Sequence, residues 1–168
     1  MIATATLSSG LTIGLADYTD PRDAADVVAL LDAYARDPMG GGEPLAEDVK
    51  ARLAGDLAAN PHAFSLIARL DDRAVGLANC FMGYSTFAAA PLVNIHDLAV
   101  LPDTRGAGIG KALMAAIEAE ALKRGACKIT LEVLSGNPAR HLYAREGYGD
   151  YQLDPETGHA LFWQKRLK

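Results

Sequence analysis

VLPDTRGAGIGK, residues 100–111, joins an expected strand to an expected helix and decides how the chain folds. The stretch Leu92–Leu101 favours a strand, and apolar residues then recur at helical spacing as far as Arg124. Three glycines alternate between them, at Gly106, Gly108 and Gly110. A helix start leaves N–H groups unpaired and carries partial positive charge, and glycines let an anion approach closely. The segment therefore predicts a phosphate-binding turn; a turn that only connects the two elements is the alternative.

The register of the glycines excludes two nucleotide-binding motifs. A P-loop would need a glycine at Arg105 and a Ser or Thr at Ala112. The dinucleotide fingerprint Gly-x-Gly-x-x-Gly would need a glycine at Lys111 or at Leu113, depending on which glycine starts it. The phosphate ligand must therefore belong to another class.

A second pattern downstream makes the segment specific. The two patterns are Val100-x-Pro102-x-x-Arg105-Gly106-x-Gly108-x-Gly110 and Asn137-Pro138-Ala139-Arg140-x-x-Tyr143-x-x-x-Gly147-Tyr148. Together they resemble the two signatures of the GNAT superfamily of N-acetyltransferases, and the resemblance covers residues 60–150 well. It implies an acetyl-CoA-dependent enzyme that transfers an acetyl group directly to a primary amine of a small molecule.

The expected order of elements suits that superfamily. The pattern predicts strands at 11–16, 63–70, 73–83, 92–101 and 127–134, helices at 21–35, 45–59, 108–124 and 137–145, and a closing hairpin of 148–153 with 160–167. The resemblance implies an α/β (α+β) fold in a single N-acetyltransferase domain over residues 1–168. Its central sheet is mixed and mostly antiparallel, with a splayed parallel strand pair and about four flanking helices.

Bulk properties narrow the partners. The net charge of −5 argues against nonspecific nucleic-acid binding, and no apolar run reaches the roughly 20 residues of a membrane helix. Cys80 and Cys127 each lie in an apolar run, so we expect buried thiols and a reducing cytoplasm. His62, His141 and His159 lack the spacing of metal ligands, so no metal is expected.

By the resemblance, one continuous stretch and one downstream residue hold acetyl-CoA. The backbone of Leu98, Ala99 and Val100 would pair with the pantetheine arm, as an added strand does. Asn137 would hydrogen-bond the same arm. The pyrophosphate would be held by the backbone and charges of Arg105, Gly106, Ala107, Gly108, Ile109, Gly110 and Lys111.

The resemblance also implies catalytic residues. Tyr143 lies where the family places the general acid, and a phenol with a reference pKa of about 10 can protonate a CoA thiolate. An aromatic packed on the last strand is the alternative. His96 and Asp97 resemble the central pair of polyamine-type members, with histidine in place of an acid, and are candidates for the general base. Strand alternation points the two to opposite faces unless a bulge intervenes, so we expect them to serve unequally.

The acceptor side is less defined. Asp37–Glu43 carries three consecutive glycines between two acids, which suggests a mobile lid whose acids attract a cationic amine; a solvent loop is the alternative. We expect Tyr84–Phe87 to line the same cleft. Other functions left open are a protein N-acetyltransferase and a noncatalytic acyl-CoA-binding regulatory module. A homodimer is common among relatives, and no nucleic-acid or membrane partner is expected.

Overall fold

A computed structural model describes residues 10–151, 154, 156, 158 and 160–167 of the chain. They fall into two compact units, Met1–Leu131 and Glu132–Lys168, and each is described by itself. The first unit carries the sheet and its covering helices. The single domain expected over residues 1–168 stays a prediction.

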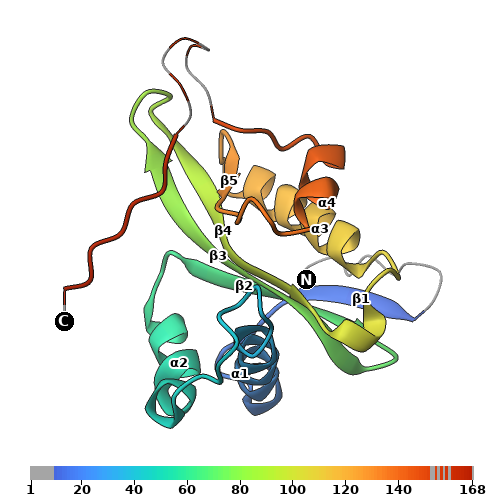
Figure 1. The fold of residues 1–168 in the computed structure, drawn as a ribbon. Helices are drawn as coiled ribbons and strands as arrows, with labels where there is room; N and C mark the ends of the chain where they lie inside the picture. The colour runs from blue at the N-terminus through green and yellow to red at the C-terminus, as the bar shows by residue number, and fades with distance from the viewer. Residues whose placement is uncertain (1–9, 152–153, 155, 157, 159, 168) are drawn as a thin grey trace. The chain divides into compact units, whose positions relative to one another are not determined.

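One five-stranded sheet forms the first unit, with its strands in the order of the sequence (Figure 1). The strands are β1 (Leu11–Leu15), β2 (Ala63–Leu70), β3 (Arg73–Ser85), β4 (Ala90–Val100) and β5 (Ile129–Leu131). The first four pair antiparallel, and β5 runs parallel to β4. This parallel pairing stops at Ile95 with Leu131, so β4 continues beyond it without β5. The expected mixed, mostly antiparallel sheet with a splayed parallel pair is confirmed.

Three helices cover the two faces of the sheet, with α1 (Pro21–Ala35) and α2 (Glu47–Ala59) on one face and α3 (Ile109–Lys123) on the other (Figure 1). The predicted start of α1 is confirmed, because the Asp20 carboxylate accepts hydrogen bonds from the first-turn amides. Of the helices in the described part of the chain, none has the length and apolarity to cross a membrane.

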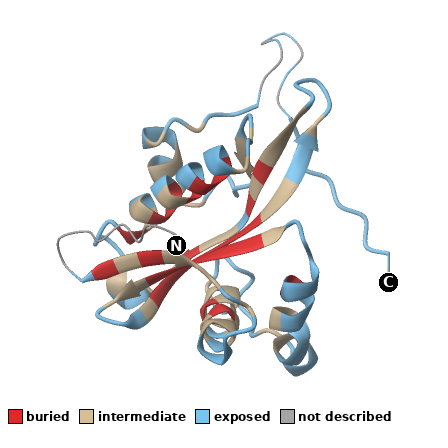
Figure 2. Ribbon diagram, turned by 180° about the vertical axis from the view of Figure 1, so that it is seen from behind, coloured by how far each residue is buried: buried red, intermediate tan, exposed pale blue. Residues whose placement is uncertain are grey.

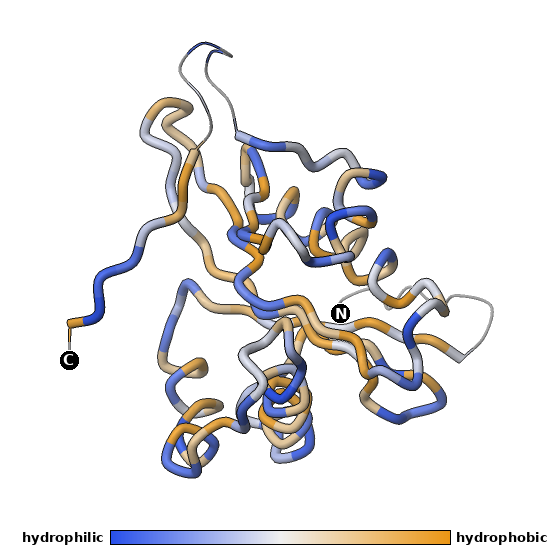
Figure 3. The backbone as a smooth tube through the Cα atoms, viewed as in Figure 1, coloured by the Kyte–Doolittle hydropathy of each residue, from blue (hydrophilic) through white to orange (hydrophobic). Residues whose placement is uncertain are grey.

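The core lies along both faces of the central strands (Figure 2). The central strands are largely hydrophobic, whereas α1 and α2 mix hydrophobic and hydrophilic residues as amphipathic helices do (Figure 3). On the α1–α2 face the buried cluster consists of Val27, Leu30, Leu57, Ile67 and Leu77. On the other face α3 buries Ile109, Leu113, Met114, Ile117, Glu120 and Ala121.

Gly76 in β3 sets how closely the start of α3 approaches the sheet. A Cβ on Gly76 would lie 3.0 Å from Leu113 Cδ1 and 3.1 Å from Ile109 Cγ2. Because these are core side chains of α3, any larger residue at this position would push the helix away. The glycine therefore helps to place the first turn of α3.

The second unit contains α4 (Arg140–Arg145), which lies within the predicted helix 137–145. The closing hairpin is wrong for residues 160–167: they form no strand, and their apolar side chains, Phe162 and Trp163 among them, are exposed. An alternating pattern forms a strand only where a partner completes the ladder. Residues 152–153 of its first arm and His159 lie outside the described residues.

The end of the first unit also differs from expectation. The strand predicted at 127–134 is confined to Ile129–Leu131. Cys127, expected to be buried, precedes this strand and is exposed, whereas Cys80 is buried as predicted. The apolar run around Cys127 was therefore an unreliable guide to burial.

Replacing Gly76 tests this packing. We expect Gly76→Val to lower the free energy of unfolding by about 1–3 kcal/mol, because overpacking forces side chains and backbone to shift. Gly14→Val is the matched control, since a Cβ on this β1 glycine would meet no atom within 4 Å. Urea denaturation of both variants measures the difference, and equal losses would contradict the packing argument.

Candidate active site

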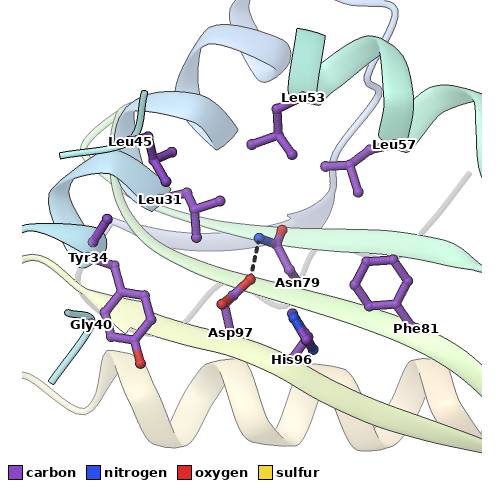
Figure 4. A pocket seen from close by; sticks show the side chains of 11 residues that line it. Leu31, Tyr34, Gly40, Leu45, Leu53, Leu57, Asn79, Phe81, His96 and Asp97 are labelled. Carbon is purple, nitrogen blue, oxygen red and sulfur yellow. Dashed lines mark hydrogen bonds between the residues drawn. The ribbon is translucent and has the colours of Figure 1, made fainter. Parts of the chain in front are cut away.

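A cavity of about 360 Å³ opens between α1, α2 and the strands β3 and β4 (Figure 4). Its apolar wall comes mainly from the helices, and its polar groups come from the strands. The lining residues are Leu31, Tyr34, Ala35, Gly40, Leu45, Leu53, Leu57, Asn79, Phe81, His96 and Asp97. The space is concave, mostly apolar and supplied with a few polar groups, as ligand sites usually are.

A β-bulge in β4 brings both candidate bases to this cavity. Asn79 of β3 is opposite Asp97, but the next residue, Cys80, is opposite Ile95, so His96 is an extra residue without a cross-strand partner. A bulge interrupts strand alternation and re-aims side chains. His96 and Asp97 therefore both line the cavity, which is the exception that the sequence analysis allowed for a bulge.

A buried hydrogen-bond chain holds the Asp97 carboxylate. Asn79 Nδ2 donates to Asp97 Oδ2 at 3.0 Å, and the Ser65 hydroxyl donates to Asn79 Oδ1 at 2.6 Å. Ser65 is 1% exposed and Asn79 is 3% exposed. A serine has a single proton, so the phenol of Tyr18, 2.8 Å from Ser65 Oγ, must be the donor in the last bond. The direction of each of these three hydrogen bonds is thus fixed, and each of the four side chains in this network has a partner.

The Tyr18 phenol, the first donor in this hydrogen-bond network, keeps its proton. Burial, the largest cause, raises the pKa of Tyr18 above its ordinary value. Tyr34, at the end of α1, lines the cavity itself, and burial together with the nearby Asp97 and Asp37 charges raises the pKa of its phenol as well. Both phenols are therefore neutral near pH 7, which leaves the negative charge in the cavity lining to Asp97.

Neighbouring groups limit what the cavity can do chemically. The ring of His96 meets that of Phe81 edge to face, with centroids 5.5 Å apart, which restricts the orientation of the imidazole. Burial raises the pKa of the Cys80 thiol to about 12, so this thiol is not a nucleophile near neutral pH. In the part of the chain that the structure describes, no group of three or more His, Cys, Asp or Glu residues is placed to hold a metal ion.

The predicted phosphate turn follows β4 after a short 3-10 helix, η1 (Pro102–Thr104). Gly106 and Gly108 have φ angles of 85° and 82°, a conformation that favours glycine, and a Cβ on either would meet no atom within 4 Å. Gly108 caps α3, so the first unpaired amides of the helix lie in this stretch. Ile109 is 2% exposed and faces the core, so only its backbone is available to a ligand. The turn fits a phosphate group.

Arg105 makes contacts that its sequence position did not reveal. Its guanidinium donates to Asp37 Oδ2 at 2.7 Å and to the backbone oxygen of Val100 at 3.1 Å. The Arg105 hydrogen bond is the largest cause that holds the pKa of Asp37 below its ordinary value. One of the two acids expected to attract an amine is therefore already paired.

The connector after α1 is a hydrogen-bonded turn. The Asp37 carbonyl oxygen accepts from the amides of Gly40 and Gly42, and the Glu43 amide donates to the Ala35 carbonyl at 3.1 Å. A Cβ on Gly40 would lie 2.0 Å from the Tyr34 carbonyl oxygen, so the chain packs directly on the end of α1. Gly40 thereby becomes part of the cavity wall.

Comparison with known proteins identifies the family. Residues 27–148, well over half of the chain, match the model of the acetyltransferase (GNAT) family. The chain belongs to the GNAT acetyltransferase family. The resemblance of the two signatures is thereby confirmed.

One sequence relative and two solved structures illustrate the similarity. The streptothricin acetyltransferase of Streptomyces lavendulae is 43% identical over 79 residues, which are 42% of this chain and 42% of that protein. The match thus spans less than half the length of the curated relative. The structure of an aminoglycoside acetyltransferase from an uncultured soil metagenomic sample, in complex with sisomicin, has a TM-score of 0.73 at 18% identity and covers 95% of this chain and 97% of its own. An aminoglycoside N-acetyltransferase in complex with CoA has a TM-score of 0.70 at 19% identity and covers 96% and 99%.

The second GNAT signature lies in the second unit. Asn137 Oδ1 accepts from the Ala139 amide at 2.9 Å, and the Asn137 carbonyl accepts from the Arg140 amide, so the asparagine shapes the turn that leads into α4. Tyr143 on α4 lies beside Tyr148, with ring centroids 6.3 Å apart. Within its own unit the motif is therefore a turn followed by a short helix.

The other predicted positions lie on β4, on α3 and at the β3–β4 hairpin. Leu98, Ala99 and Val100 form the end of β4 beyond its pairing with β5. Lys111 is exposed in the first turn of α3. Tyr84–Phe87 does not line the cavity; it lies at the β3–β4 hairpin, where Phe87 is 95% exposed, so that expectation is wrong.

Sequence reasoning missed two polar groups of the cavity, Asn79 and Tyr34. Asn79 interrupts an apolar strand between Ala78 and Cys80, and a lone polar residue in such a run is a signal of a buried hydrogen bond. Its partner Asp97 is 18 residues away, so the pair itself requires the strand register.

Reversing the polar pair tests the role of Asn79. In Asn79→Asp two carboxyls would meet, so the pKa of one rises above its unfolded value of about 4. The added destabilisation is therefore absent below that pH and grows as pH rises, reaching about 1–3 kcal/mol at pH 8. The double variant Asn79→Asp/Asp97→Asn again pairs one carboxylate with one amide and should recover most of the loss. Urea denaturation at pH 5 and pH 8 checks both; a pH-independent loss, or no recovery, would contradict the hydrogen bond.

Proposed function

We propose that the protein is an acetyl-CoA-dependent N-acetyltransferase that acetylates a primary amine of a small molecule. The single observation that carries the proposal is the β4 bulge, which presents His96 and Asp97 together in one cavity. The bulge lies between the end of the parallel strand pair and the glycine turn. A proton acceptor thus lies on the same strand that leads into a phosphate site.

The similar proteins support both substrates of this reaction. Streptothricin acetyltransferase and the two aminoglycoside acetyltransferases are named for small-molecule acceptors, and one of them was solved with CoA. The cavity fits an acceptor of that size better than a peptide, because helices α1 and α2 wall it on one side. A protein acceptor would favour an open groove, which makes protein N-acetylation the second candidate.

The reaction needs no covalent enzyme intermediate. The neutral amine nitrogen attacks the thioester carbonyl carbon, so an N–C bond forms while the C–S bond breaks and its electron pair leaves on the CoA sulfur. The proton lost by the nitrogen passes to the protein, and the sulfur takes up a proton to give free CoA. The products are the N-acetylamine and CoA.

We assign the proton acceptor role to the pair at the bulge. Asn79 occupies Asp97 Oδ2, which leaves the other carboxylate oxygen to orient the ammonium group of the acceptor. His96 is exposed, so its imidazole can pass the proton to solvent. Tyr143 would be the acid that protonates the CoA sulfur; this role rests on the sequence signature.

The chain's own residues offer a consistent site for CoA. The backbone of Leu98–Val100 lies beyond the pairing with β5 and suits strand-like contacts to the pantetheine arm. The turn 105–111 suits the pyrophosphate, because its two positive-φ glycines leave open space beside the start of α3. Lys111 adds positive charge there, and Arg105, whose side chain stays 53% exposed beside Asp37, would add to it. Asn137 would hold the arm; this role rests on the sequence signature.

Three further properties belong to the proposal. We expect a cytoplasmic protein that forms a homodimer and binds neither nucleic acid nor membrane, which agrees with its net charge of −5. A noncatalytic acyl-CoA-binding module would share the glycine turn but would have no need of a carboxylate held by hydrogen bonds in the cavity.

Acetyl-CoA binding and turnover test the proposal together. Calorimetry should detect acetyl-CoA binding, and free CoA should be released when an amine panel is added. Gly108→Ala should raise the KM for acetyl-CoA at least about tenfold, because it adds strain and a methyl group where a phosphate approaches. Gly125→Ala is the matched control: its φ is 72° and its Cβ would also meet open space, but it lies at the other end of α3. If acetyl-CoA did not bind, the proposal would be wrong. Equal KM changes in Gly108→Ala and Gly125→Ala would show that the turn is not part of the cofactor site.

The role of Tyr143 has its own test. Tyr143→Phe should lower kcat by about 100-fold, the usual lower bound for losing a general acid, with little change in the KM for acetyl-CoA. Tyr148→Phe also removes a phenol hydroxyl from the same ring pair and should keep near-normal kcat. Undiminished turnover in Tyr143→Phe would rule out the acid role.

A further inference from the structure

The cavity has one charged end and one apolar end. His96, Asp97 and Asn79 come from the strands, whereas the helices and the connector between them contribute leucines (Figure 4). These leucines are Leu31 on α1, Leu45 in the connector, and Leu53 and Leu57 on α2. Figure 4 shows them on the side of the cavity that faces Asn79 and Asp97.

Two acids on or just after α1 are already paired with basic residues. Asp37 is paired with Arg105 at 2.7 Å. Asp32 on α1 is paired with Arg36 at 2.9 Å and with Lys50 at 3.3 Å. Neither acid lines the cavity. Among the described lining residues, Asp97 is therefore the carboxylate that a cation can reach.

A second cation in the same ligand would find no second carboxylate among the lining residues. An ammonium group placed against the leucines would lose its hydration without gaining a hydrogen bond or a counter-charge, which is costly in an apolar site. A hydrocarbon chain or ring in the same place would stabilise the complex, because water leaves both apolar surfaces. The lining thus discriminates between acceptors by the charge of the part remote from the reacting nitrogen.

We propose that the acceptor is a primary amine with a single positive charge carried on an apolar chain or ring. The inference rests on the proposed N-acetyltransferase function and names its substrate class. The ammonium lies at Asp97, and the hydrocarbon part lies against Leu53, Leu57 and Leu31. Polycationic amines are poor acceptors for this site.

A series of linear alkylamines tests the apolar end directly. From propylamine to hexylamine the amine basicity stays nearly constant, so changes in kcat/KM report contact with the wall. We expect kcat/KM to rise about fourfold per added methylene, as burial of one CH₂ predicts. The comparison of hexylamine with 1,6-diaminohexane isolates the charge: the diamine should have at least about tenfold lower kcat/KM.

A charge introduced on the wall should reverse this preference. Leu53→Asp should lower kcat/KM for hexylamine and raise it for 1,6-diaminohexane, so that the diamine becomes the better acceptor. Leu122→Asp is the matched control, because Leu122 lies on α3 and is 68% exposed; it should keep the normal preference. Circular dichroism and the KM for acetyl-CoA, which should match the unsubstituted protein, establish that each variant is folded.

The outcomes separate this inference from the proposed function. A kcat/KM that stays flat along the alkylamine series, or a preference of the unsubstituted protein for the diamine or for sisomicin, would overturn the monocationic class while leaving N-acetylation intact. Release of CoA with no amine at all, despite acetyl-CoA binding, would overturn the function itself. A rising series with the reversal in Leu53→Asp supports the inference.

Discussion

The one-residue mismatch between β3 and β4 is the constraint on which the rest of the structure depends. The last parallel pair of β4 with β5 is Ile95 with Leu131, and the next residue, His96, is the bulge. A bulge bends its strand and increases its local twist. The same extra residue thus directs two side chains into one cavity. It also lies where β4 separates from β5. A regular strand would place Asp97 on the α1–α2 face without His96.

The acids near this cavity differ in whether a basic residue pairs with them. The chain has a net charge of −5, yet Asp32 and Asp37 near the cavity are each held by a basic residue. Asp97 is held by neutral groups instead, through Asn79 and Ser65. A carboxylate stabilised by neutral donors keeps its charge available to a ligand, whereas one paired with arginine does not. Within the cavity lining, the negative charge available to a ligand therefore lies at Asp97.

Local signals predicted most of the elements, and the contacts between them were beyond the sequence. Asp20 and Pro21 predicted the start of α1, and the glycines predicted the start of α3. Both signals are local, because caps and positive-φ positions depend on neighbouring residues only. The bulge at His96 depends on which residue of β3 lies opposite, and the Arg105–Asp37 pair spans 68 positions. The family signatures predicted the candidate residues, whereas the leucine wall of the cavity became visible only with the packing of α1 and α2.

The apolar wall also bears on how the amine loses its proton. An ammonium that enters beside Asp97 leaves water for a partly apolar space, where its attraction to the carboxylate is stronger than in bulk solvent. The same loss of hydration disfavours the charged form of the amine, so the proton is released more readily than in water. These two effects oppose each other at the nitrogen, and the balance depends on how much of the ligand is apolar. A hydrocarbon substituent would shift it towards the neutral amine by excluding water, and in the proposed mechanism His96, which lines the cavity and is exposed, would carry that proton away.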